Sequence, residues 1–301
     1  MTPISNNSIH VMNSNENSKI TKKMNAGATH IALILLSMVF VFPLVWMIIT
    51  SIKPIEETMS DKFVLIPSKI QYENYWKAFT YQSDKLGYIP FLVYARNTLL
   101  LCILTVSGTV TSCALVAYSF ARLRWPGRDQ LFFATLATMM IPFPVLMVPI
   151  YSMYRNLGWI GSFKPLWVGA WFGSAFFIFM LRQFFRTLPF ELSEAARIDG
   201  CSEFGIFVKV ILPLCKPALS VVALLTFIGT WNDFLGPLIY LLDQKTFTLG
   251  LGLQFYQSQN GGTEWNLLMA ASTMVIAPVL ILFFFTQKQF IQGIAVTGLK
   301  G

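Results

Sequence analysis

The sequence predicts an all-α membrane protein with six transmembrane helices. Of its 301 residues, 55% are hydrophobic and only 12% are charged, whereas an average soluble domain has roughly 25% charged residues. The hydrophobic residues form long blocks rather than the spaced pattern of an amphipathic helix, which indicates segments surrounded by lipid. The length alone would also allow two soluble domains, but one polytopic membrane domain over residues 30–301 fits the blocks better.

Residues 1–29 differ from the rest of the chain because they are rich in Asn, Ser and Thr and offer no apolar face to bury. This composition favours a disordered tail. The apolar stretch that follows, residues 31–49, is longer than the hydrophobic region of a secretory signal, and no small-residue cleavage site follows it. We therefore expect this stretch to remain in the protein as its first span.

Six segments are long and apolar enough to cross a bilayer, which takes about 20 residues of helix. They are residues 30–50, 97–120, 131–154, 165–185, 217–241 and 267–286. An even number of spans places both termini on the same side of the membrane.

The basic residues predict which side that is. With the N-terminus inside, 13 Lys and Arg residues fall on the cytoplasmic side and 9 on the outer side. Acidic residues reduce these totals to about +7 and +1, and cytoplasmic loops carry the excess of positive charge. The charge pattern therefore predicts a multi-pass protein of the cell membrane, plasma or inner, with both termini in the cytoplasm.

Three prolines interrupt the third span, at positions 142, 144 and 149. Each proline removes a backbone donor, so the helix should bend where they occur. A static kink is the simpler interpretation, and a hinge that gates a passage is the alternative.

The loop between the fourth and fifth spans, residues 194–213, reads EAARIDGCSEFGIFVKVILP. Ala195 and Ala196 favour a helix with little side-chain bulk, which another protein could approach closely. Gly200 should end this helix in the left-handed conformation, and Ser202 should cap a second short helix. The loop therefore predicts a helix-turn-helix elbow on the cytoplasmic face.

Motifs for nucleotide binding, hydrolysis and metal binding are missing. The sequence contains no G-x-x-x-x-G-K-[ST], no G-x-S-x-G and no H-E-x-x-H. Its four cysteines form no C-x-x-C pair, and its two histidines, His10 and His30, lie far from them in sequence. We therefore expect no enzymatic activity, no cofactor, no metal site and no nucleic-acid partner.

The elbow resembles the signature of the membrane subunits of ATP-binding-cassette importers, which is EAA, three residues, G, nine residues and I-x-L-P. Val210 stands where isoleucine is commonest. Three shorter motifs resemble the carbohydrate-uptake group and its maltose-type second permease: QYENY at 71–75, TWNDF at 230–234 and TGLKG at 297–301. The likeness covers about residues 30–301.

This resemblance implies a type I importer permease fold with a cytoplasmic coupling helix. It also implies a second permease subunit, two cassette ATPase subunits that use the ATP, and an extracytoplasmic sugar-binding protein. The residues that it assigns to ATPase coupling are Glu194, Ala195, Ala196, Asp199, Gly200, Leu212 and Pro213, with a further contact at Gly298, Leu299, Lys300 and Gly301. The expected function is therefore import of a sugar or oligosaccharide.

Asn232 and Asp233 are polar residues inside the fifth predicted span. A charge in lipid is costly, so Asp233 should face the protein interior or a water-filled cavity. Gly229, Gly236 and Pro237 favour a bent or partly opened helix around it. Two interpretations stay open: the pair lines the translocation path, or it locks one span to another.

Two other transport functions compete with sugar import. The same machinery could import glycerol phosphate or another polar solute, but the span interiors contain no Lys or Arg to attract an anion. An ion-driven secondary transporter should show inverted repeats, and we find no internal repeat. The sequence does not identify the sugar.

Overall fold

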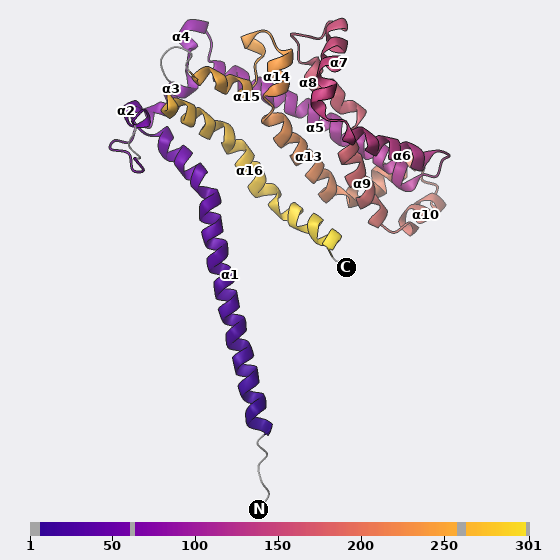
Figure 1. The fold of residues 1–301 in the computed structure, drawn as a ribbon. Coiled ribbons are helices and arrows are strands. Elements are labelled where there is room, and N and C mark those ends of the chain that lie inside the picture. Colours follow the sequence, from indigo (N-terminus) through magenta and orange to yellow (C-terminus); the bar gives the residue numbers. More distant parts are fainter. Residues whose placement is uncertain (1–6, 61–63, 258–262, 299–301) are drawn as a thin grey trace, which may run out of the picture.

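A computed structural model describes residues 7–60, 64–257 and 263–298 of the protein. Three long helices form the centre of the molecule. They are α5 (Pro90–Arg122), α13 (Lys216–Trp231) and α16 (Trp265–Gly298), and α13 packs against both of the others (Figure 1). A fourth helix, α9 (Ala175–Thr187), packs against α5. Every element within the described ranges is helical, which confirms the predicted fold class.

Shorter helices and turns connect these four and extend the chain at both ends. In chain order they are α1 (Asn7–Ser51), α2 (Ile55–Thr58), α3 (Glu73–Phe79), α4 (Ser83–Leu86), α6 (Arg128–Ala137), η1 (Thr138–Met140), α7 (Phe143–Asn156), α8 (Lys164–Trp167), η2 (Val168–Phe172), α10 (Glu191–Ile198), α11 (Glu203–Ile206), the π-helical η3 (Phe207–Ile211), α12 (Leu212–Leu214), α14 (Leu235–Tyr240), η4 (Gln244–Thr246), α15 (Leu249–Gly252) and η5 (Leu253–Tyr256).

The described residues contain four helices that are long and apolar enough to cross a membrane. These are Thr29–Ser51, Pro90–Arg122, Lys164–Thr187 and Trp265–Gln287. Two bent helix pairs raise the number to six when each pair is counted as one span. The third predicted span is one of these pairs. In the fifth, α13 alone has 16 residues and reaches the length of a span only together with Glu203–Leu214 of the loop before it.

The third span is broken rather than kinked. Its halves, Arg128–Met140 and Phe143–Asn156, meet at 98°. Ile141 and Pro142 between them are extended, with ψ angles of 114° and 139°. A residue before proline is pushed out of the helical region, and proline itself has no N–H to continue the ladder. The proline pattern therefore predicted the position of the bend but not its size.

The fifth span ends sooner than residues 217–241, which the sequence predicts as one helix. Its helix α13 stops at Trp231, and the chain becomes helical again only in α14, six residues long. At its other end α13 meets the segment Glu203–Leu214 at 79°. Side chains of Asn and Asp compete with the helix ladder for backbone groups, which explains a break at Asn232 and Asp233.

Helix α1 leaves the body of the molecule. It packs against α16 near its C-terminal end, and Figure 1 shows the rest running away from the other helices. None of its most apolar window is buried inside the chain. The helix begins at Asn7, within the segment 1–29 whose composition predicts disorder; that disorder stays a prediction.

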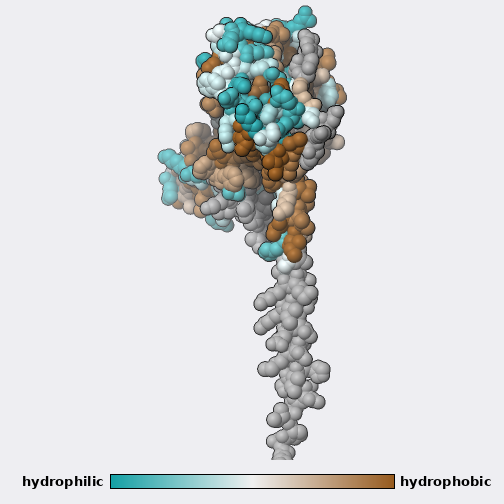
Figure 2. Space-filling view, turned by 90° about the vertical axis from the view of Figure 1, so that its left-hand side faces the viewer, coloured by the Kyte–Doolittle hydropathy of each residue, from teal (hydrophilic) through white to brown (hydrophobic). Residues whose placement is uncertain are grey.

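Polar and apolar surfaces are separated along the molecule. Figure 2 shows hydrophilic residues gathered over the end that carries α2, α3 and α4, with hydrophobic residues below them. Helix α10 and the C-terminal end of α16 lie toward the other end in Figure 1. A core of side chains from α5, α9, α11, η3 and α13 joins the elbow to the spans, with Leu181, Phe185, Ile206, Ile211 and Val222 fully buried.

Candidate functional site

The elbow begins with α10, and local chemistry fixes its shape. Gly200 follows this helix in the left-handed conformation, with φ of +80°, which a side chain would strain. The Ser202 hydroxyl accepts a hydrogen bond of 3.2 Å from the Gly205 N–H and so caps α11. Both features confirm the sequence predictions. The second helix is less regular than expected, because η3 lies between α11 and α12.

The motif residues lie mostly on the outside of this elbow. Glu194, Ala195, Asp199 and Gly200 are exposed, and the Ile198 side chain beside them is 86% exposed. A single exposed apolar side chain is common on protein surfaces, so Ile198 by itself does not mark a partner surface. The other three assigned residues lie closer to the core or the next span: Ala196 and Leu212 are half-buried, and Pro213 is exposed.

Two residues of α5 hold the elbow at separate points. The buried guanidinium of Arg122 donates hydrogen bonds to the carbonyl oxygens of Leu188 (2.9 Å) and Pro189 (3.2 Å), just before α10. The Tyr118 hydroxyl lies 3.2 Å from Oε2 of Glu203 at the start of α11. The end of α5 thus fixes both helices of the elbow relative to the membrane spans.

An ion pair closes the turn of the elbow from the solvent side. Arg197 Nε donates a 3.0 Å hydrogen bond to Oε1 of Glu203. This hydrogen bond, together with the charge of Glu203, raises the pKa of Arg197. Sequence reasoning missed Tyr118, Arg122 and Glu203 as a group, because their contacts join segments 66 to 85 residues apart and no spacing rule connects them.

The helix break after α13 is the second functional candidate. Trp231 is buried and donates from Nε1 to the carbonyl oxygen of Val275 (3.0 Å), which joins α13 to α16. Asn232 is exposed and donates to the carbonyl oxygen of Ile228 (2.9 Å). The Asp233 carboxylate accepts a hydrogen bond from the Gly236 N–H (3.1 Å) in the first turn of α14. These side-chain bonds of Asn232 and Asp233 are local, and the neighbouring Trp231 makes the contact between spans.

A cavity of about 380 Å³ lies next to this break, between the end of α13 and the start of α16. Its lining is Phe234, Gly250, Leu253, Gln254, Gln257, Leu268, Met269 and Ser272. Amide and hydroxyl groups can donate to and accept from sugar hydroxyls, and Phe234 adds an exposed aromatic face. No lining residue carries a charge, so the cavity suits a neutral polar solute.

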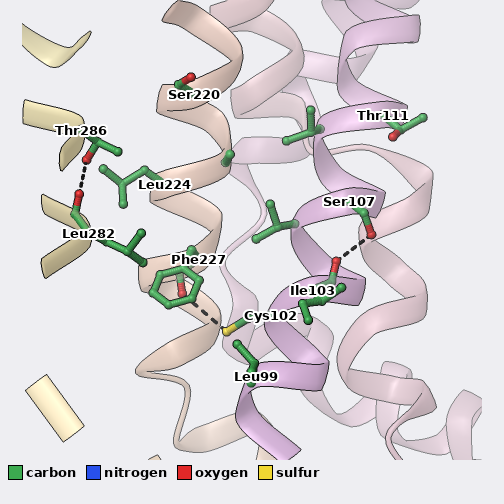
Figure 3. A pocket seen from close by; sticks show the side chains of 13 residues that line it. Leu99, Cys102, Ile103, Ser107, Thr111, Ser220, Leu224, Phe227, Leu282 and Thr286 are labelled. Carbon is green, nitrogen blue, oxygen red and sulfur yellow. Dashed lines mark hydrogen bonds between the residues drawn. The ribbon is translucent and has the colours of Figure 1, made fainter. Parts of the chain in front are cut away.

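A larger groove, of about 640 Å³, lies between α5, α13 and α16 and has a different character (Figure 3). Its lining is mainly apolar, and two of its hydroxyls bond to their own helices: Ser107 donates to the carbonyl oxygen of Ile103 (2.7 Å) and Thr286 to that of Leu282 (2.8 Å). Leu99, Leu224 and Phe227 are among its apolar lining residues. The groove therefore suits lipid or an apolar helix rather than a sugar.

The QYENY motif has a structural explanation. Asn74 is buried and donates to the carbonyl oxygens of Ser51 (3.0 Å) and Lys53 (2.9 Å), while Asn266 donates to its Oδ1 (3.4 Å). The motif thus joins the end of α1, α3 and the start of α16.

Two further sequence predictions concern the C-terminus and metals. Gly298 is the last residue of α16, and Leu299, Lys300 and Gly301 lie outside the described residues. Among the residues that the structure describes, no cluster of three His, Cys, Asp or Glu could hold a metal ion.

Broken spans, a polar cavity toward one end and an exposed elbow toward the other are features expected of a helical permease. Residues 111–296 match the family described as binding-protein-dependent transport system inner membrane component. The chain belongs to this family, and it is the membrane-spanning permease subunit of an ATP-binding-cassette importer.

Individual relatives agree with this assignment. The chain is 35% identical over 268 residues to the arabinooligosaccharides transport system permease protein AraQ of Halalkalibacterium halodurans, covering 88% of this chain and 93% of the relative. It is 31% identical over 273 residues to the trehalose/maltose transport system permease protein MalG of Thermococcus litoralis, covering 90% and 95%.

A solved structure has the same fold. A chain from a bacterial ABC transporter involved in the import of the acidic polysaccharide alginate aligns with a TM-score of 0.76 and 23% identity, covering 95% of this chain and 99% of that one. This likeness confirms the importer permease fold.

Proposed function

We propose that this permease imports a neutral sugar or oligosaccharide and forms half of the translocation path. One observation carries the proposal: the cavity beside the α13 break combines amide, hydroxyl and aromatic groups with no charged side chain. Relatives aligned over nearly the whole chain are named for arabinooligosaccharide and trehalose/maltose transport. Asn232 and Asp233 directly precede Phe234 of this cavity and would belong to the same path, with Asn232 exposed and Asp233 accepting a hydrogen bond from α14.

The elbow would transmit the movement of the ATPase during ATP hydrolysis to the membrane spans. Glu194 would offer a carboxylate to a basic residue of a cassette ATPase, Ala195 and Ala196 would allow close approach, and the exposed Ile198 would be covered by that partner. Two such ATPases would bind and hydrolyse the ATP, one on each permease subunit. This chain would need no nucleotide, metal or other cofactor of its own. Gly298, Leu299, Lys300 and Gly301 provide a second ATPase contact.

The surfaces of the chain offer places for the remaining expected partners. The apolar window of α1 is not buried within the chain, and the groove between α5, α13 and α16 is open and apolar. A second permease subunit would pack on these surfaces, with lipid covering the rest. A sugar-binding protein would dock on the hydrophilic end that carries α2, α3 and α4. Both termini would lie in the cytoplasm.

Uptake by cells that carry the complete transporter tests this function. Cells lacking only this chain should lose accumulation of one labelled neutral oligosaccharide from a panel, and the wild-type chain should restore it. Anionic solutes such as glycerol phosphate should not compete for uptake. Competition by glycerol phosphate, with no loss of any oligosaccharide, would contradict the sugar assignment.

The coupling surface has its own matched test. Glu194→Lys should abolish uptake because it places a positive charge against a basic groove, while the protein still inserts into the membrane. Glu191→Lys makes the same change at another exposed position of α10, outside the motif, and should retain most uptake. Equal activity of the two variants would show that Glu194 has no special role in docking.

A further inference from the structure

A second polar cavity, of about 390 Å³, lies at the elbow end of the molecule, between the end of α5, the start of α6 and the end of α9. Its lining is Phe120, Ala121, Arg124, Arg128, Asp129, Arg182, Arg186 and Phe190. Four arginines therefore surround one cavity with a single carboxylate. None of these residues belongs to the importer signature or to the cavity beside the α13 break.

The carboxylate of Asp129 is shared, so it does not balance the arginines. Arg128 Nε donates to it at 2.9 Å, and Arg182 lies 3.8 Å from the same oxygen. Within the described part of the chain, the ion pairs of this cavity all converge on Asp129. Positive charges held close together repel one another, so an anion between them would be bound favourably.

Arg182 is preorganised for such an anion. The residue is buried, its Nε donates to the carbonyl oxygen of Phe120 (3.3 Å), and its guanidinium stacks on the Phe132 ring at 3.9 Å. The guanidinium of Arg182 is held in place, and those of Arg124 and Arg186 are exposed at the rim. This arrangement suits the paired oxygens of a phosphate, which arginine binds through two parallel hydrogen bonds.

The surroundings identify the source of the phosphate. Leu131 and Phe133 of α6 are 55% and 74% exposed, and Phe179 of α9 is 37% exposed. These apolar side chains belong to the membrane-spanning parts of the same two helices whose ends carry the arginines. The cavity therefore lies where hydrocarbon gives way to headgroups, and basic pockets between spans on the cytoplasmic side bind anionic lipid headgroups.

We propose that this cavity binds the phosphodiester headgroup of an anionic phospholipid. The proposal depends on the proposed function only for its cytoplasmic orientation. Phe190 lines the cavity and directly precedes α10, and the guanidinium of Arg122 stacks on its ring at 4.5 Å. A bound headgroup would therefore stabilise the link between α9 and α10. It would thereby favour one orientation of α10 relative to the membrane spans.

Native mass spectrometry of the purified full chain tests the site without substrate or ATPase. The chain in detergent is titrated with phosphatidylglycerol or with phosphatidylcholine, which has no net charge. We expect selective retention of phosphatidylglycerol. The double variant Arg124→Gln/Arg186→Gln should weaken it by roughly tenfold or more, since hydrogen bonds between charged groups are lost. Both positions are exposed, so the fold should survive.

Two controls make the result decisive. Arg155→Gln changes an exposed arginine at the end of α7 and should leave lipid retention unchanged, while Arg124→Lys/Arg186→Lys should keep most of it. Equal retention by the Gln double variant and the wild type would overturn the proposal. Displacement of the lipid by millimolar inorganic phosphate would also overturn it, in favour of a free-anion site. Loss of ATPase capture in the Gln variant, with lipid retention intact, would assign the arginines to a protein contact instead.

Discussion

Gly200 and Asp233 show how single residues shape the two ends of this permease. Gly200 supplies a backbone conformation, and a Cβ atom there would meet nothing within 4 Å. Its role is therefore conformational rather than steric. Asp233 supplies a carboxylate to α14, and Gly236 and Gly250 let the chain approach it, because a Cβ at either position would lie within 3.0 Å of its atoms.

We predict that Gly200→Val uncouples the permease without preventing its insertion. The left-handed conformation costs a residue with a side chain about 1–2 kcal/mol, so the angle between α10 and α11 should change. Gly158→Val is a matched control, because Gly158 also has a positive φ (+67°) and open space but lies after α7. Substrate-stimulated ATP hydrolysis by the reconstituted complex should be lost only in Gly200→Val. A similar loss in both variants would point to general instability.

For Asp233, the hydrogen bond to the Gly236 N–H predicts different effects of two substitutions. Asp233→Asn keeps an oxygen that can accept this bond, whereas Asp233→Leu leaves the N–H without its partner, at a cost of about 1–3 kcal/mol. Uptake should be retained better by Asn than by Leu. The measurement is the initial rate of labelled sugar uptake at equal membrane levels, and undiminished uptake in both variants would remove Asp233 from the functional site.

At the scale of elements, local chemistry was readable from the sequence and long-range contacts were not. Gly200, Ser202 and the prolines at 142 and 144 act within a turn or two, so their helix ends could be predicted. The Arg122 clamp, meaning its hydrogen bonds to the carbonyl oxygens of Leu188 and Pro189, joins α5 to the link between α9 and α10. In the sequence, Arg122 is only one positive charge among several. The 98° bend of the third span also depends on packing that no local pattern records.

The Arg122 clamp leads to a prediction about how the elbow is anchored. Arg122→Met keeps an unbranched apolar stem but removes the donors to Leu188 and Pro189, and a hydrogen bond from a charged group contributes about 1.5–3 kcal/mol. We expect a lower melting temperature and weaker coupling of ATP hydrolysis to uptake. Arg96→Met, at an exposed position near the other end of α5, should change neither. An unaltered melting temperature in Arg122→Met would mean that the clamp is not stabilising.

At the scale of the whole molecule, the two candidate sites lie toward opposite ends of one helix. The polar cavity beside the α13 break and the exposed elbow are joined by α13 itself, which begins beside the elbow and ends at Trp231. A rigid helix between them can carry a displacement of the elbow to the cavity, while Trp231 holds its far end to α16. The hydrophobic blocks of the sequence predicted the number of spans. Only the fold shows that the cavity and the elbow lie toward the two ends of α13.

This arrangement works only if the elbow faces the cytoplasm, where ATP is available. The basic residues predict that orientation, since 13 of 22 fall on the side of the termini and the elbow. A reporter enzyme that is active only in the cytoplasm should therefore work when fused after Gly127, before α6, or after Ser202 in the elbow. The same reporter should fail when fused after Asp61 or Gly261, between the spans on the opposite side, where an enzyme active only after export should work instead. Cytoplasmic activity of the fusion at Asp61 would invert the topology, and with it the assignment of the elbow as the surface that receives the ATPase.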